Sequence, residues 1–160
     1  MLNITVICVG KLKEPYLQAA CDEYRKRLQG LCKCTVLELP PERLPDSPST
    51  AQIAAALEKE GQRILEKIPS GAAVIAMCIE GKQLSSEALA KKIAEFAVSG
   101  TGSLVFIIGG SFGLSSAVKQ KSTLRLSVSE MTFPHQLFRV MLLEQIYRAL
   151  QINAGAKYHK

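Results

Sequence analysis

The sequence predicts an α/β fold in which helices cover both faces of a mostly parallel sheet. Segments typical of strands alternate with segments typical of helices along the whole chain, which indicates parallel strands joined by helical crossovers. The segments 73–79 and 104–108 are apolar runs without polar alternation, as expected of strands covered on both faces. The 160 residues suit one domain with its own core, and no repeat divides them.

Glycines, prolines and charges mark the elements of the first half of the chain. A first strand is predicted at 2–9, and a helix follows at 14–28, with a proline in its first turn, basic residues in its last turn and Gly30 just beyond. The next strand, 32–39, alternates and should have one more exposed face. The segment 40–49 contains four prolines and predicts a loop, either a lid or a plain connector.

The second half repeats the alternation and ends in a long helix. Its predicted elements are a helix at 50–67 capped by Ser49 or Thr50, a strand at 73–79 stopped by Glu80-Gly81-Lys82, a helix between Ser85 or Ser86 and Gly100, strands at 104–108 and 124–128 around a short helix, and a helix at 136–153. The last helix is apolar nearly all round, so we expect its own sheet to cover one side and a partner subunit another.

Two loops after neighbouring strands predict a ligand site. Gly109-Gly110-Ser111-Phe112-Gly113 follows the strand at 104–108, and residues 129–135 follow the strand at 124–128. Ligands of open α/β sheets bind outside the carboxyl ends of strands, and glycines let the main chain come close to them. A plain turn that needs positive φ is the alternative. The spacing to Glu130 also imitates a dinucleotide-binding turn, but the pattern is G-G-x-x-G and little chain remains for such a fold.

Charge and cysteine content limit the classes of partner. The net charge is +6, and residues 116–160 hold seven basic against two acidic side chains. This asymmetry predicts a polyanionic partner, RNA or DNA ahead of a membrane, with a solvated basic surface as the alternative. Five cysteines without a C-x-x-C pair favour a reducing cytoplasm over a disulfide framework or a zinc site. The apolar N-terminal segment is too short to span a membrane.

Several motifs together resemble one enzyme class. They are 9–13, 60–65, the glycine turn 109–113, the block 126–140, the segment 144–149 and the terminal Tyr158-His159-Lys160. In these the chain resembles the SPOUT class of RNA methyltransferases, and within it the bacterial enzymes that methylate N3 of a pseudouridine in large-subunit ribosomal RNA. The resemblance implies a C-terminal trefoil knot, a homodimer, and S-adenosylmethionine bound in the knot.

The resemblance also implies residue roles. The cofactor contacts carried over from it are Met77, Gly109, Gly110, Val128, Ser129, Glu130, Met131, Thr132 and Phe133. Relatives often have leucine where Met77 stands, and Glu130 falls at a variable position, so only its main chain is given a role. Two loops of main-chain groups with a few apolar side chains are also the usual composition of a small-molecule pocket.

The catalytic candidates are His159, Tyr158 and Arg148. Transfer to a uracil-type N3 needs removal of its proton, for which His159 is the first candidate, while Tyr158 and Arg148 would place the base or the RNA backbone. The alternatives are a frayed chain end for His159 and a surface i,i+4 pair with Glu144 for Arg148.

Two further residues of the last helix have open roles. His135 is a second-choice base or, more simply, a structural residue at the helix entrance. For Arg139 we expect a pair across a dimer interface rather than a contact with an RNA phosphate.

These observations predict a cytoplasmic, homodimeric, S-adenosylmethionine-dependent rRNA methyltransferase without a metal. No separate RNA-binding module is present, so we expect the assembled ribosome as substrate and a contribution of the dimer partner to the site. The alternatives are a non-catalytic RNA- or ribosome-binding protein of the same fold and, third, a nucleotide-cofactor oxidoreductase.

Overall fold

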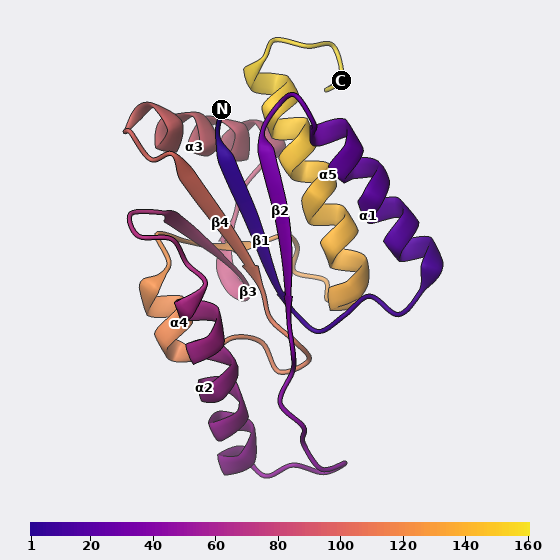
Figure 1. Ribbon diagram of the computed structural model, residues 1–160, viewed down its shortest axis with the longest axis vertical. Helices are drawn as coiled ribbons and strands as arrows, with labels where there is room; N and C mark the ends of the chain where they lie inside the picture. Colours follow the sequence, from indigo (N-terminus) through magenta and orange to yellow (C-terminus); the bar gives the residue numbers. More distant parts are fainter.

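A five-stranded, all-parallel sheet in the order β2-β1-β4-β3-β5 forms the centre of the molecule (Figure 1). The computed structural model describes all 160 residues. The strands are β1 (Asn3–Val9), β2 (Lys33–Leu39), β3 (Ala73–Gln83), β4 (Ser103–Ile108) and β5 (Leu124–Ser127). The helices are α1 (Pro15–Leu28), α2 (Thr50–Glu66), α3 (Ser86–Val98), α4 (Ser116–Lys121) and α5 (His135–Asn153). The predicted fold class is confirmed.

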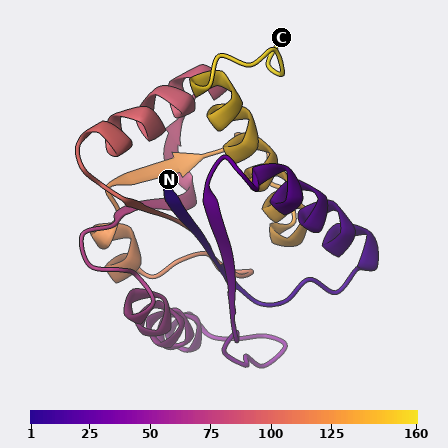
Figure 2. The same cartoon turned by 45° about the horizontal axis from the view of Figure 1, so that its top comes forward.

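Alternate side chains of the central strands supply two cores, one on each face. Val6, Ile75 and Phe106 belong to the larger core, which α1, α3 and α5 cover. Their neighbours Ile7 and Val105 belong to the smaller core under α2 and α4. Figure 2 shows the two groups of helices on opposite sides of the sheet. The apolar runs of β1, β3 and β4 follow directly from this double covering.

Strand β3 is longer than predicted, because it continues through Glu80-Gly81-Lys82 to Gln83. Leu126 of β5 pairs with both Met77 and Lys82, so residues 78–81 bulge out of the ladder between these two positions. A Cβ on Gly81 would lie 2.6 Å from the carbonyl carbon of Leu126. The chain leaving β3 therefore passes directly over the main chain of β5.

Helix α5 is buried mainly by its own chain. It packs against α1 and α3 as well as the sheet, and Leu143, Ile146 and Ala149 are completely buried. The expectation that a partner subunit covers its second side is wrong for these residues, since neighbouring helices do so. Leu137 is the one exposed large apolar residue of α5, at 40%, while Val140, Met141, Leu150 and Ile152 are half-buried.

Arg139 makes an intramolecular ion pair, which corrects the prediction of a pair across a dimer interface. Its side chain is 4% exposed, and Nη1 donates to Glu38 Oε2 at 2.6 Å while Nη2 donates to the carbonyl oxygen of Gly10 at 3.1 Å. Nε has no partner. The burial of Glu38 works to raise its pKa, but hydrogen bonds from Arg139 and the Leu12 N–H hold that pKa below its ordinary value. The pair ties α5 to β2 and to the turn after β1.

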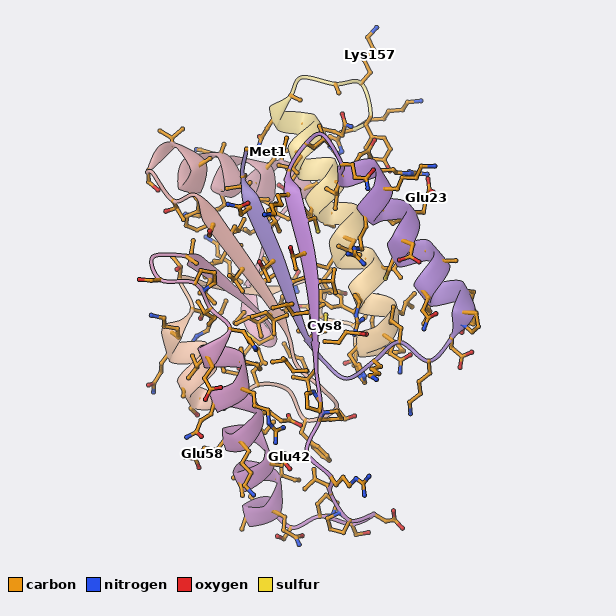
Figure 3. The ribbon with its side chains drawn as sticks, in the orientation of Figure 1. Met1, Cys8, Glu23, Glu42, Glu58 and Lys157 are labelled. Atoms are coloured by element: carbon orange, nitrogen blue, oxygen red, sulfur yellow. The ribbon has the colours of Figure 1, made fainter.

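The proline-rich segment 40–49 is attached to α2. Arg63 donates to the carbonyl oxygen of Pro40 at 3.1 Å and pairs with Glu42, and the Glu42 N–H donates to Glu60 at 2.8 Å. Figure 3 labels Glu42 beside this helix. The segment then ends in a capping box, because Ser49 and Gln52 exchange hydrogen bonds of 3.1 and 2.8 Å. These contacts support the connector interpretation over a lid.

Candidate active site

A cavity of about 720 Å³ lies at the carboxyl ends of β3, β4 and β5. The glycine turn after β4 and the loop after β5 form two of its walls, and the end of β3 forms a third. Eight of the nine predicted cofactor contacts line it, namely Met77, Gly109, Gly110, Val128, Ser129, Met131, Thr132 and Phe133. Parallel strands bring their carboxyl ends to one edge of the sheet, which explains why segments fifty residues apart meet here.

The glycine turn forms its wall from main chain. The Gly113 N–H donates to the carbonyl oxygen of Gly110 at 3.1 Å, and Gly113 has a φ of 86°. A Cβ on Gly109 would lie 2.7 Å from the carbonyl carbon of Gly113, closer than real Cβ atoms approach main chain. The turn closes this tightly only because residue 109 has no side chain.

The loop after β5 holds its shape by local hydrogen bonds. Ser127 Oγ donates to the carbonyl oxygen of Ser129 at 3.0 Å, and Ser129 Oγ accepts the Met131 N–H at 3.0 Å. Val128 and Met131 are 42% and 74% exposed, so apolar side chains stand open at the cavity rim. Glu130 is exposed and is the one predicted cofactor contact that does not line the cavity.

Polar and charged side chains also line the cavity, namely Glu80, Ser111, Lys119, Ser127, Ser129, Thr132 and His135. His135 lines it, and burial, followed by the charges of Arg139 and Lys13, lowers the pKa of this imidazole. Lys119 forms an ion pair with Glu80, and that hydrogen bond lowers the Glu80 pKa. The cavity therefore combines main chain of the glycine turn with apolar and polar side chains, and His135 lines it at the start of α5.

The three catalytic candidates form one hydrogen-bonded cluster at the other end of α5. Glu144 accepts from Arg148 Nε at 3.0 Å, from Arg148 Nη2 at 2.7 Å and from the Tyr158 hydroxyl at 3.1 Å. Arg148 Nη1 donates to His159 Nδ1 at 3.2 Å. Burial and the Glu144 hydrogen bond raise the Tyr158 pKa, so the phenol stays protonated. The terminal residues are docked and not frayed, and the i,i+4 pair of Arg148 coexists with its contact to the tail.

Aromatic rings fix the direction of the tail. The Tyr158 ring meets Tyr147 edge-on with centroids 4.8 Å apart, and the Arg148 guanidinium lies over Tyr158 at 4.7 Å. Tyr147 is itself 6.4 Å from Tyr24 of α1. Figure 3 shows the tail, marked by Lys157, beyond the end of α5 that is remote from the cavity.

Within one chain the cluster and the cavity are apart. None of His159, Tyr158 and Arg148 lines the cavity. His135 and Arg148 are thirteen residues apart on α5, which is about 20 Å of helix. Between them lies a second, more apolar groove of about 490 Å³ bounded by α3 and α5, which shares Met77 and Val128 with the cavity.

Sequence reasoning missed two carboxylates of the cluster. Glu144 appeared only as the surface partner of Arg148, whereas it also anchors Tyr158. Glu87 accepts a hydrogen bond from His159 Nε2 at 2.8 Å although 72 positions separate them. The only local signal was the position of Glu87 in the first turn of a helix, where acidic residues are common anyway.

Comparison with known proteins defines the class to which this fold and site belong. Residues 2–159 match the family model described as "Predicted SPOUT methyltransferase". The chain belongs to the SPOUT methyltransferase family. It is therefore a methyltransferase, an activity that requires a methyl donor. Full-length relatives named "Ribosomal RNA large subunit methyltransferase H" are 52% identical in Bifidobacterium animalis subsp. lactis (strain AD011) and 51% identical in Clostridioides difficile (strain 630), and each alignment covers 99% of this chain and all of the relative.

A solved structure agrees with the fold. A probable methylase family protein from Haemophilus influenzae Rd KW20 superposes with a TM-score of 0.55 at 12% identity, over 99% of this chain and 70% of that protein. The passage of residues 78–81 over the end of β5, just before α5, fits the trefoil knot expected of the family. The strand order also differs from the 3-2-1-4-5-6 order of a dinucleotide-binding fold.

The structure contains neither a metal cluster nor a helix that could cross a membrane. No group of three or more His, Cys, Asp or Glu side chains is arranged to hold a metal ion. Cys32 and Cys34, the one pair with a possible metal spacing, are free thiols, and burial raises the Cys32 pKa to about 12. None of the five helices combines the length and apolarity needed to cross a bilayer.

Proposed function

We propose that the protein transfers the methyl group of S-adenosylmethionine to N3 of a pseudouridine in large-subunit ribosomal RNA, on the assembled ribosome in the cytoplasm. The observation that carries the proposal is the main-chain-lined cavity at the ends of β3, β4 and β5 in a member of the SPOUT family. The names of the full-length relatives supply the substrate class. The excess of basic residues after position 116 suits an RNA partner.

The residues of the cavity fit such a cofactor. Its volume of about 720 Å³ lies within the usual range for small-molecule sites. Main-chain N–H and C=O groups of the two loops can hydrogen-bond to the edge of an adenine, while Met77, Val128 and Phe133 provide apolar walls. The close turn at Gly109 is a cradle that any side chain would disrupt. When bound, S-adenosylmethionine supplies an electrophilic methyl group on a sulfonium that departs as a neutral thioether.

The chain's own residues would align the acceptor base and take its proton. In this proposal His159 accepts the N3 proton, and Tyr158, a neutral hydroxyl donor held by Glu144, orients the base with Arg148. His135 lines the cavity at the first residue of α5, at the opposite end of that helix from the cluster, so it serves the cofactor side of the site.

A homodimer would bring the two halves of the site together. The cluster and the cavity lie at opposite ends of α5, and the exposed Leu137 with the half-buried Val140 and Met141 lies between them. A two-fold axis through this stretch would place the tail of one protomer at the cavity of its partner. We therefore propose that each site combines the cavity of one chain with the tail of the other.

Methyl transfer to ribosomes tests the proposed function. Purified protein with labelled S-adenosylmethionine should methylate assembled ribosomes and leave short free RNA unmodified. Calorimetric titration should show binding of S-adenosylmethionine and none of NAD. Binding to ribosomes without binding of either cofactor would favour a non-catalytic role. Equal methylation of short free RNA would exclude the assembled ribosome as the required substrate.

Mixed dimers test the shared site. A protein with Gly109→Ala lacks a working cavity, and one with His159→Asn lacks the proposed base. If the site is shared, mixing the two inactive proteins should restore about a quarter of the wild-type activity, because half the dimers would be mixed and each would hold one intact site. No recovery after demonstrated subunit exchange would show that the tail acts within its own chain.

A further inference from the structure

The hydrogen bonds of His159 define which ring nitrogen carries a proton. Nε2 is 2.8 Å from Glu87 Oε1, and Nδ1 is 3.2 Å from Arg148 Nη1. A carboxylate can only accept and a guanidinium can only donate. Nε2 therefore bears the hydrogen and Nδ1 presents its lone pair. The hydrogen bond from His159 also holds the Glu87 pKa below its ordinary value.

We propose that Glu87 is a positioning residue for methyl transfer, because its carboxylate fixes the tautomer and direction of His159 and leaves Nδ1 as the atom that accepts the N3 proton. This inference rests on the proposed function. In the step, the N3–H bond breaks, the proton goes to Nδ1 of His159 and the electron pair stays on N3. N3 uses this pair to form the new bond to the methyl carbon. The electron pair of the broken sulfur–carbon bond stays on sulfur. The resulting imidazolium faces the Glu87 carboxylate.

Arg148 marks the place of the acceptor base. Its Nη1 donates to Nδ1 from a position that the N3–H of the base would have to occupy. The same guanidinium is hydrogen-bonded to Glu144 through Nε and Nη2. It can therefore lose its hydrogen bond to His159 Nδ1 and stay bound to Glu144. Displacement of Nη1 by the substrate therefore leaves the rest of the cluster in place.

Helices α3 and α5 give Glu87 a firm base. Ser86 Oγ donates to Gln145 Oε1 at 2.7 Å, and Asn153 Nδ2 donates to the carbonyl oxygen of Ala90 at 3.0 Å, so the two helices are joined along their contact. The charged and titratable groups that face His159 are Glu87 from α3, Arg148 with its partner Glu144 from α5, and Tyr158 beside it in the tail. Of the two carboxylates, Glu87 and Glu144, only Glu87 hydrogen-bonds to the His159 ring.

Two substitutions separate positioning from a role in helix stability. Glu87→Gln keeps the shape of the side chain but removes its charge. Glu87→Asp keeps a negative charge in the first turn of α3 but moves the carboxylate away from His159, because the side chain is one methylene shorter. If Glu87 acts through His159, both variants should lower kcat by about three- to tenfold, as expected for partial loss of general-base catalysis. Glu95→Gln on the same helix is the matched control, since Glu95 pairs only with the exposed Lys92.

Nuclear magnetic resonance supplies a readout that does not depend on turnover. The chain has two histidines, so nitrogen-15 spectra of the imidazoles contain His159 and His135 alone. The wild-type spectrum should show the Nε2–H tautomer of His159. Glu87→Gln should give a mixture of both tautomers, because an amide can donate as well as accept, while His135 is unchanged.

Each outcome decides the inference. Wild-type kcat in Glu87→Asp, together with the wild-type tautomer of His159 in Glu87→Gln, would reduce Glu87 to a helix-terminus residue and overturn the proposal. Unchanged kcat in His159→Asn would remove the base and this inference with it, while methylation by the wild type would still support the proposed function.

Discussion

The cavity and the C-terminal cluster are built from different parts of the chain. Main chain of two loops and a few apolar side chains enclose the cavity, and the parallel sheet fixes where those loops meet. The cluster consists of polar side chains from α3, α5 and the tail, joined by hydrogen bonds at a partly exposed surface. A site made from main chain should tolerate exchanges of side chains but not an added Cβ. A site made from side chains should lose chemistry, with little loss of stability, when one of them is removed.

Removing the tail should give the largest effect. Deletion of residues 158–160 removes Tyr158 and His159, and turnover should fall by about 10²- to 10⁴-fold, the usual contribution of general acid–base catalysis. The affinity for S-adenosylmethionine, measured by calorimetry, should stay nearly unchanged because the walls of the cavity come from β3, the glycine turn and the loop after β5. Deletion of Lys160 alone is the control and should leave turnover intact. Unchanged turnover after the longer deletion would remove the cluster from the mechanism.

Adding one carbon to the glycine turn should instead lower the stability of the fold and the affinity for the cofactor. In Gly109→Ala the new Cβ would lie 2.7 Å from the carbonyl carbon of Gly113, so the turn must open. We expect a loss of about 1–3 kcal/mol in the free energy of unfolding, as in other overpacked sites, and weaker cofactor binding. Gly102→Ala is the matched control, because its Cβ would have no neighbour within 4 Å. Equal melting temperatures and affinities in the two variants would mean that the turn does not depend on its glycine.

The Arg139–Glu38 pair lies between the two regions and should respond to acid. Glu38→Gln leaves a buried guanidinium poorly paired, and we expect a loss of about 1–2 kcal/mol, limited by the 37% exposure of Glu38. Since the folded-state pKa of Glu38 is below its ordinary value of 4.5, its contribution is present above that pH and is lost as the pH falls further. Urea unfolding at pH 7 and pH 3 measures this. The difference between wild type and variant should shrink at the lower pH, and a constant difference would contradict the assigned pair.

Local patterns predicted the fold and the cavity because both depend on strand ends. Continuous apolar runs identified strands covered on both faces, and the glycine turn and the loop after β5 then had to share one edge of the sheet. The predicted strand at 73–79 was too short because Glu80-Gly81-Lys82 is a combination of residues typical of turns. Its pairing depends on β5, some forty residues later, and on the close passage of Gly81 over Leu126.

The cluster was predicted only in part because its contacts are distant in sequence. Within the cluster, Glu87 and His159 are 72 positions apart, and outside it Arg139 and Glu38 are 101 positions apart. No periodicity or capping rule relates such residues, since which ends of which helices meet is decided by the path of α5 through the fold. The resemblance to the SPOUT class indicated the tail itself, but not the two carboxylates that hold it.

Exchange of Met77 for leucine should give the smallest effect and tests the main-chain character of the cavity. Met77 lines both the cavity and the neighbouring groove, and a Met-to-Leu change nearly conserves volume, so the free energy of unfolding should change by less than about 1.5 kcal/mol. Affinity for S-adenosylmethionine should also be nearly unchanged, because an apolar wall offers either side chain the same kind of contact. Met77→Ala is the contrasting variant, since it removes the wall and should weaken binding measurably by calorimetry. If Met77→Leu weakened binding as much as Gly109→Ala, cofactor binding would depend on one particular side chain. The contrast between a main-chain site and a side-chain cluster would then no longer hold.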